Sequence, residues 1–333
     1  MALKHEAMRE SPFAFFRGSF FRWAKQWKLW CPQVANAPRV LAVGDPHVEN
    51  FGTWRDAEGR LIWGVNDFDE AWRLPYTSDL VRLSASAILA SRERALSSPE
   101  GSLPDTILQG YSACLEADGQ PFVLAEHHAP LRAMALARLK DAQTYWRRIE
   151  ANRKLPRSVP RHPVRTVRRS LPAGTVEIRW VHRLAGIGSL GRERITAIGS
   201  WRGGKVAREA KALAPSACMW AEGRGSPRRR WHRLLLSHPL RCPDPFAQIR
   251  RQWIIRRLAP DCARIALDGL RKGDDERDLL RAMGWEVANV HLASRNCHEI
   301  LEDLASRDRR WLQDATHAAL DAVEKDYKAW SDG

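Results

Sequence analysis

The chain has 333 residues, of which 44% are hydrophobic and 28% are charged, and this composition is typical of a globular protein and excludes a disordered one. Its longest apolar runs are far shorter than the roughly 20 residues that cross a bilayer, so we expect no membrane partner. The first residues mix both charge signs and lack an apolar signal core, which predicts a cytoplasmic location.

Charge and cysteine content limit the kinds of ligand. The net charge of +15 would suit a nucleic-acid-binding protein, but many of the arginines are dispersed through helical stretches, where a solvated face is the usual explanation. We therefore expect a general attraction for phosphorylated ligands and no specific nucleic-acid site. The six cysteines include no C-x-x-C pair, which predicts reduced thiols, mostly buried, and neither a zinc knuckle nor a disulfide framework.

The first elements surround a polar loop. Strands are predicted at 39–43 and, after a turn at 56–59, at 61–65, with the loop 44–50 between them. Apolar residues at helical spacing then predict a helix over 78–95, with an N-cap at Ser78 or Asp79.

Later segments divide the chain. Helices are expected at 103–117 and 131–152, an antiparallel meander at 175–184, 192–201 and 205–210, a further strand at 253–258, and helices from 267 to 330. The predicted organisation is a helical lobe with the catalytic loop over 1–152, a basic proline-rich linker over 153–174, a nucleotide-binding sheet lobe over 175–260, and C-terminal helices over 261–333 that pack on the helical lobe.

The loop 44–50 carries residues suited to phosphoryl transfer, which needs a base, oxygen ligands for magnesium and a cradle for phosphates. Asp45 and Asn50 are five residues apart, so that a carboxylate can face an acceptor while an amide oxygen turns toward a metal. Asp67, just past the next strand, could complete the metal site. The alternative is that Asp45 and Asn50 only cap a tight turn.

The order of these motifs resembles two groupings of known proteins. The series Gly44-Asp45-x-His47-x-x-Asn50, Asp67-Phe68-Asp69 and Asp79-Leu80 resembles the aminoglycoside-phosphotransferase branch of the protein-kinase-like superfamily. With the segment 11–19, it also resembles, over nearly the full chain, the bacterial family called domain of unknown function 2252 (DUF2252). The resemblance implies an α+β, two-lobed, protein-kinase-like (aminoglycoside-phosphotransferase-like) fold.

The resemblance also implies roles. Asp45 corresponds to the catalytic-loop aspartate, and Asp79 corresponds to a buried aspartate that braces this loop. His47 belongs to the same catalytic loop, where we expect a hydrogen-bonding brace in preference to a base, because kinase-type transfer requires no imidazole. The implied magnesium ligands are Asn50, Asp67 and Asp69.

A glycine-rich segment is the candidate nucleotide-covering loop, with Gly186, Gly188, Ser189 and Gly191. Such a motif alone is weak evidence, but here it lies between two strands and precedes a third strand that ends near a cation, which is the order of a kinase nucleotide site. It follows the catalytic loop in the chain, so the resemblance implies a circular permutation. We expect it to fold over a cleft whose floor holds Asp45, Asn50 and Asp67.

The cation that grips the phosphates is either Arg208 or Lys211. Strand alternation places Lys211 on the same face as Ala207, and a compact ammonium suits such a pocket better than a guanidinium, which favours Lys211.

The sequence therefore predicts an ATP- and magnesium-dependent phosphotransferase acting on an unknown small-molecule acceptor. The alternatives are a kinase-like module that binds nucleotide without turnover, a nucleotidyltransferase on the same fold, and a basic RNA-binding protein on this scaffold. Two expectations concern the N-terminal segment. Arg17 either reaches a phosphate or pairs with an acid, and the residues Trp23, Trp27 and Trp30 belong to the core and not to a base-stacking platform.

Overall fold

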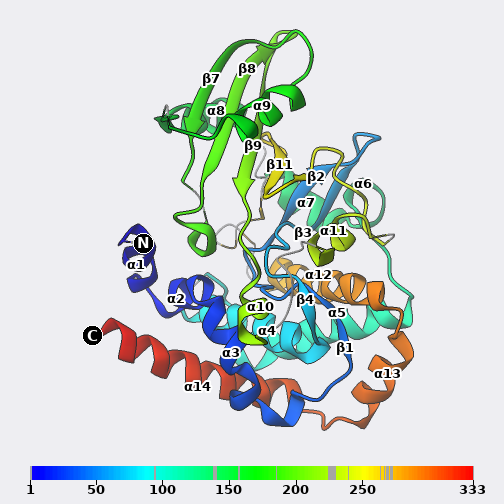
Figure 1. Cartoon of the computed structure of the whole chain (residues 1–333). Helices are drawn as coiled ribbons and strands as arrows, with labels where there is room; N and C mark the ends of the chain where they lie inside the picture. The colour runs from blue at the N-terminus through cyan, green and yellow to red at the C-terminus, as the bar shows by residue number, and fades with distance from the viewer. Residues whose placement is uncertain are drawn as a thin grey trace.

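A computed structural model gives the architecture of the chain. It describes residues 2–93, 95–137, 141–156, 158–184, 186–223, 230–238, 240–262, 264–265, 267, 270 and 273–332. The fold is mixed α+β with antiparallel sheets, as predicted. A six-stranded sheet with two helices stands above a larger group of helices (Figure 1). We call these the sheet part and the helical part.

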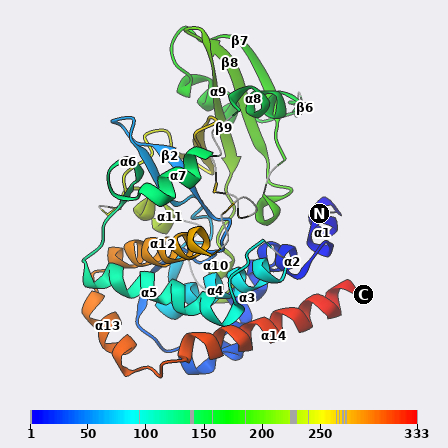
Figure 2. The ribbon, with the colours of Figure 1, turned by 180° about the vertical axis from the view of Figure 1, so that it is seen from behind.

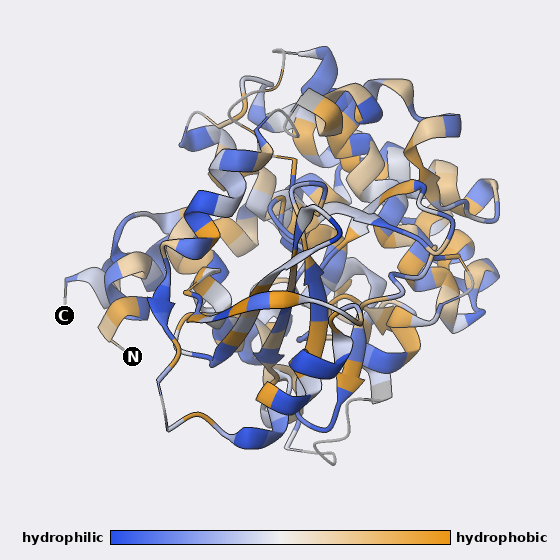
Figure 3. Ribbon diagram, turned by 90° about the horizontal axis from the view of Figure 1, so that it is seen from above, coloured by the Kyte–Doolittle hydropathy of each residue, from blue (hydrophilic) through white to orange (hydrophobic). Residues whose placement is uncertain are grey.

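The helical part is built from long helices that pack around a common core. Helix α12 packs against α5, and α14 packs against α4. Along these helices hydrophobic and hydrophilic stretches alternate, as expected of helices with one buried side (Figure 3). Its elements are α1 (Ala2–Arg9), α2 (Pro12–Gly18), α3 (Phe20–Trp30), α4 (Tyr76–Arg92), α5 (Leu103–Glu116), α12 (Asp274–His291), α13 (Cys297–Ser306) and α14 (Trp311–Ser331).

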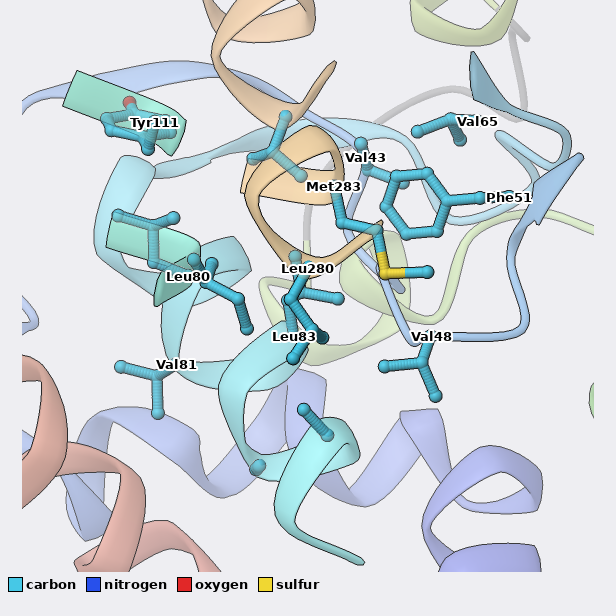
Figure 4. Close-up of a cluster of buried hydrophobic side chains, with 14 of the residues drawn as sticks. Val43, Val48, Phe51, Val65, Leu80, Val81, Leu83, Tyr111, Leu280 and Met283 are labelled. Carbon is cyan, nitrogen blue, oxygen red and sulfur yellow. The ribbon is translucent and has the colours of Figure 1, made fainter. Parts of the chain in front are cut away.

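The core of the helical part joins residues from both ends of the chain. Val43, Val48 and Phe51 lie around Met283 of α12, and Leu80 of α4 belongs to the same cluster (Figure 4). Helices α5 and α12 come close enough that a Cβ atom at Gly110 or Gly284 would lie 1.9 Å from a backbone oxygen of the other helix. Glycine is therefore required at both positions.

Short strands lie between α3 and α4 and position the polar loop. Strand β1 (Arg39–Ala42) pairs antiparallel with β4 (Trp72–Pro75), and β2 (Phe51–Arg55) pairs with β3 (Leu61–Val65), which also pairs with β5 (Phe122–Val123). The predicted strand ends at 39–43 and 61–65 agree with the structure to within one residue, and β2 is the partner strand of the hairpin around 56–59, for which no bounds were predicted.

The sheet part is a six-stranded antiparallel sheet in the order β10-β11-β9-β8-β7-β6. The predicted meander is confirmed as β7-β8-β9, and the predicted strand at 253–258 is β11. Helix α9 (Arg161–Ser170) packs on one face of the sheet and α8 (Ala142–Glu150) on the other (Figure 2). The strands are β6 (Arg153–Lys154), β7 (Val176–His182), β8 (Arg194–Trp201), β9 (Gly204–Ala212), β10 (Gln248–Arg250) and β11 (Trp253–Leu258).

Shorter helices connect the larger elements. They are α6 (Leu124–His127), α7 (Ala129–Ala137), α10 (Ala217–Ala221), α11 (Arg230–Leu236) and the 3-10 turns η1 (Pro32–Val34), η2 (Glu100–Ser102), η3 (Ile187–Ser189) and η5 (Leu292–Ser294). No helix in the described ranges is both long and apolar enough to cross a membrane.

Three predictions of local structure need correction. The segment 153–174, expected to be a linker, contains β6 and α9, because Val167 and Leu171 supply an apolar face that packs on the sheet. The helix expected over 131–152 is divided into α7 and α8, since the Asp141 side chain caps a new helix at Thr144 N; residues 138–140 of that prediction lie outside the described residues. Helix α4 starts at Tyr76, so neither Ser78 nor Asp79 is its N-cap.

The tryptophans and cysteines follow expectation in part. Trp23 and Trp27 are buried and Trp30 packs against the same core, which confirms their predicted place. All six cysteines are free, but Cys242, Cys262 and Cys297 are only partly buried.

Candidate functional site

A cavity of about 460 Å³ lies where the sheet part meets the helical part. It brings together the polar loop, the residues after β3, the glycine-rich segment and the N-terminal helices. Asp45, Asn50 and Asp67 all line it, as the sequence predicted for the cleft beneath the glycine-rich segment. Its polar and glycine lining is Lys4, Arg17, Gly18, Asp45, His47, Glu49, Asn50, Asn66, Asp67, Asp69, Glu70, Arg183, Gly186, Gly188, Arg192, Arg194, Arg256 and Arg264.

The start of the polar loop is held by Asp79 of α4. Its carboxylate is fully buried and accepts hydrogen bonds from Val43 N (2.7 Å) and Gly44 N (3.0 Å). His291 Nε2 lies 3.1 Å from the same carboxylate, and His291 Nδ1 lies 2.9 Å from the hydroxyl of Tyr111. Asp79 thus fixes the backbone just before Asp45, which is the bracing position that the resemblance implied.

Asp45 is oriented by a buried arginine. Arg82 Nε donates to Asp45 Oδ1 over 2.6 Å, and the Arg82 guanidinium, 1% exposed, also lies 4.1 Å from the ring centroid of Phe16. The Asp45 side chain remains 17% exposed and lines the cavity. Burial raises the pKa of the Asp45 carboxyl, and Arg82 opposes this shift. Asp45 is therefore a fixed carboxylate with raised basicity.

Asn50 joins the loop to the segment after β3. Its Nδ2 donates to Asp45 O (3.1 Å) and Asp67 O (3.0 Å), and its Oδ1 accepts from Asp67 N (3.0 Å). Because a carbonyl oxygen has two lone pairs, Oδ1 could still take a metal while keeping one of these bonds. The role of a turn brace and the role of a ligand are thus compatible in this residue.

His47 takes the bracing position expected of it. Its Nδ1 accepts a hydrogen bond from Glu49 N (3.3 Å). Burial and the neighbouring Arg17 and Arg82 lower the pKa of His47 well below its ordinary value, so the ring stays neutral at physiological pH.

Lys211 crosses from the sheet part to the acids of the helical part. Its side chain is fully buried and its ammonium is hydrogen-bonded to Asp67 and lies 2.7 Å from Asp69. Burial alone would raise the pKa of Asp67, but Lys211 and Arg256 hold it well below its ordinary value. Asp67 is therefore ionised throughout the physiological range.

Arg208, the other candidate cation, lies on the opposite face of β9. Its guanidinium is 4.3 Å from the ring centroid of Phe246, whereas Lys211 pairs with Asp67, which lines the cavity. Alternation along the strand separates positions 208 and 211, so one strand cannot bring both to the same site. Of the two candidates, only Lys211 reaches Asp67.

The glycine-rich segment contributes part of its predicted set. Gly186 and Gly188 line the cavity, and a Cβ atom at Gly188 would lie 3.3 Å from Arg17 O. Gly191 is not among the lining residues, and the side chain of Ser189 lies outside the described part of the structure. The segment is not a simple hairpin turn, because it contains η3, which packs against α1 and α2.

Several charged residues of the site were missed in the sequence. Arg192 Nη1 lies 2.7 Å from Asp69 Oδ2, and Arg192 Nη2 lies 3.8 Å from Glu70 Oε1. Lys4 of α1 reaches the same cavity, where burial and Arg192 lower its pKa. Arg17 pairs with Glu49, so of its two predicted roles the acid pairing is seen. Arg192 could have been suspected because it lies at the start of a predicted strand, next to the glycine-rich segment. Nothing in the local sequence pattern indicates that Lys4 belongs to the site.

Two buried atoms at the cavity make no hydrogen bond with the described residues, although Asp69 Oδ1 lies 3.9 Å from His232 Nδ1. They are the donor Nε of Arg17 and the acceptor Oδ1 of Asp69, and both residues line the cavity. No group of three or more His, Cys, Asp or Glu side chains in the described ranges is arranged to hold a metal ion. A cation at Asn50, Asp67 and Asp69 would therefore need further oxygen ligands from phosphates and water, which is how magnesium is usually held beside a nucleotide. The residues present fit a nucleotide and magnesium bound together.

Comparison with known proteins concerns the N-terminal half. The family described as an uncharacterized protein conserved in bacteria (DUF2252) matches residues 1–157. The family resemblance is confirmed for this segment. The match includes Asp45, Asn50, Asp67 and Asp79 but ends before the glycine-rich segment and Lys211, so it is shorter than the nearly full coverage that was expected. No curated protein and no solved structure matches the chain.

Proposed function

We propose that the chain is an ATP- and magnesium-dependent, kinase-like phosphotransferase acting on a small-molecule acceptor. The observation that carries the proposal is the fully buried Lys211, which extends from the sheet part and pairs with Asp67, a residue that lines the cavity together with Asp45. A lysine on the second strand after a glycine-rich loop and an aspartate that holds magnesium are the parts that kinase-type transfer requires.

The nucleotide would occupy the cavity between the two parts. Lys211 and Arg192 would hold the phosphates, and Gly186 and Gly188 allow close approach of the backbone. A smaller chamber of about 170 Å³ shares Arg183, Arg194 and Arg256 with the main cavity, and its lining adds apolar side chains that suit a base: Trp54, Leu236, Ile254 and Leu258. The order of these parts in the chain corresponds to a circularly permuted kinase.

Asn50, Asp67 and Asp69 would hold the magnesium ion. Bound ATP supplies the phosphoryl group, and the cation neutralises charge on its phosphates. Asp45 accepts the proton of the acceptor hydroxyl or amine, and its raised pKa makes it a better proton acceptor than an ordinary aspartate. Arg82 keeps the carboxylate oriented while it does so.

One observation favours a second candidate, a module that binds nucleotide without turnover. The 2.6 Å ion pair with Arg82 occupies one oxygen of Asp45 and opposes its protonation. A carboxylate restrained in this way could serve as a structural anchor and leave the nucleotide site intact. The two candidates differ only in whether phosphate leaves the nucleotide.

The first experiment measures thermal stability with ATP, magnesium and both together. Both together should raise the melting temperature, because a ligand that binds only the native state stabilises it. Asp67→Ala should abolish most of this shift, whereas Asp321→Ala, at an exposed position on α14, should leave it unchanged. The absence of a shift at millimolar ATP with magnesium would overturn the proposal.

Turnover is tested with slow ATP hydrolysis or with transfer to a metabolite extract. Asp45→Asn should retain the ATP-dependent stabilisation and lose about two to four orders of magnitude in turnover, the usual contribution of a positioned base. Asn50→Ala should weaken nucleotide binding itself. Full activity in Asp45→Asn would refute its role as the base, and nucleotide binding without any transfer in the wild type would establish the non-catalytic candidate.

A further inference from the structure

A second cavity, of about 640 Å³, lies on the opposite face of the six-stranded sheet from Lys211. It is bounded by α9, by β9 and by the residues around β10. Arg208 and Ile255 point into it from the face that α9 covers, because Ile255 belongs to the cluster that contains Val167 of α9. This cavity is therefore separate from the proposed nucleotide site.

The lining of the second cavity is cationic. No acidic residue belongs to its lining within the described part of the chain, and its basic and polar members are His162, Thr166, Arg169, Ser170, Arg208, Gln248, Arg250 and Arg251. Arg169, Arg250 and Arg251 are exposed and form a rim, whereas Arg208 is 5% exposed. The charge distribution is that of a pocket for an anion, with one buried cation below several exposed ones.

Arg208 is the residue that requires a ligand. One of its terminal nitrogens donates to Ala207 O (3.0 Å), but its Nε is buried without a hydrogen-bond partner. Among the described residues no carboxylate lies within ion-pair distance of it. Burial and the neighbouring Arg257 lower the pKa of Arg208, and Asp244 offsets only part of this effect. A buried guanidinium without a paired anion is costly, and a bound anion would remove that cost.

We propose that this cavity binds a phosphate-bearing small molecule through Arg208. A guanidinium forms two parallel hydrogen bonds with phosphate oxygens, and the ring of Phe246 holds the Arg208 plane in place. The volume is that of a site for a small ligand, and the buried charge lies at the floor of a concavity. An extended nucleic-acid backbone is read by an exposed row of cations and would leave this floor unused.

The test uses inorganic pyrophosphate as the probe in isothermal titration calorimetry without magnesium. The full chain carrying Lys211→Met, which weakens the first site, should bind one pyrophosphate, and adding Arg208→Gln should weaken this binding at least tenfold. Arg250→Gln, at the exposed rim, should weaken it about threefold to tenfold and serves as a second variant if Arg208→Gln fails to fold. Arg179→Gln, exposed on β7 outside the cavity, is the matched control and should bind as before.

Three outcomes would overturn the assignment. One is unchanged pyrophosphate affinity in the Arg208→Gln variant, or, where that variant does not fold, in Arg250→Gln. Another is that a single-stranded RNA oligomer binds more tightly than pyrophosphate and that this RNA binding is lost in Arg208→Gln. That result would assign the cavity to nucleic acid. The third is loss of the ATP and magnesium stabilisation in Arg208→Gln on the otherwise wild-type chain, because the two cavities would then be one site. Retention of that stabilisation supports two independent sites whether or not the phosphotransferase proposal holds.

Discussion

Replacement of Asp79 by alanine should destabilise the helical part more than any surface substitution. The change leaves Val43 N and Gly44 N without an acceptor in a region that excludes water, and it also removes the partner of His291. Each unsatisfied buried group costs roughly 1–3 kcal/mol, so the two amides together account for about 2–6 kcal/mol. Since domains are stable by only about 5–15 kcal/mol, the loss should be easy to detect.

The assay is urea unfolding followed by tryptophan fluorescence, with the midpoint and slope measured for each variant. Asp79→Asn keeps one carbonyl acceptor and should lose about half as much as Asp79→Ala. Asp321→Ala, at an exposed site on α14, should stay within about 0.5 kcal/mol of the wild type. A loss below about 1 kcal/mol for Asp79→Ala would refute the bracing role assigned to this carboxylate.

Two further predictions concern the cavity rim and the helix interface. Burial raises the pKa of Glu70 from its ordinary value of 4.5 to about 7. Between these two pH values the native chain keeps a proton on Glu70 that the unfolded chain has released, so the free energy of unfolding should fall as the pH rises from 4.5 to about 7. Glu70→Gln should remove this loss and be more stable than the wild type by about 1–3 kcal/mol at pH 8 in urea unfolding; parallel stability curves from pH 4.5 to 8 would contradict the prediction. Gly284→Ala should destabilise the protein by about 1–3 kcal/mol in urea unfolding, because the new Cβ atom would lie 1.9 Å from Ile107 O. The control Ala288→Gly on the same helix should cost only about 1 kcal/mol beyond its lost packing. An unchanged free energy of unfolding in Gly284→Ala would show that α5 and α12 can separate.

Local periodicity predicted the elements that carry the site. The strand at 61–65, the meander and the long C-terminal helices follow from alternation and helical spacing, and alternation also separated Lys211 from Arg208. Helix α9 was missed because its prolines and arginines are typical of a linker, although Val164, Val167 and Leu171 recur at helical spacing on the side that packs on the sheet. Composition thus outweighed a periodic signal in that segment.

Charges that meet across the cavity were beyond reach of the sequence. Arg192 and Lys4 are far from Asp69 and Glu70 in the chain, and no local spacing relates them. The Arg82 contact with Asp45 belongs to the same class, since a helix position one turn after Asp79 could equally face solvent. Long-range ion pairs depend on how segments that are distant in the chain are placed on one another, and a pattern within one segment contains no information on that placement.

The ion pairs that join the two parts involve the same groups that would hold a ligand. Lys211 and Arg192 come from the sheet part, and Asp67 and Asp69 come from the helical part. A polyanion that entered the cavity would draw the cations toward itself, and a cation entering with it would take over the carboxylates. Because each buried charge would exchange one partner for another, the net electrostatic cost of binding would stay small. On the proposed function, nucleotide and magnesium should therefore bind well only as a pair, since either one alone would leave one set of buried charges without partners.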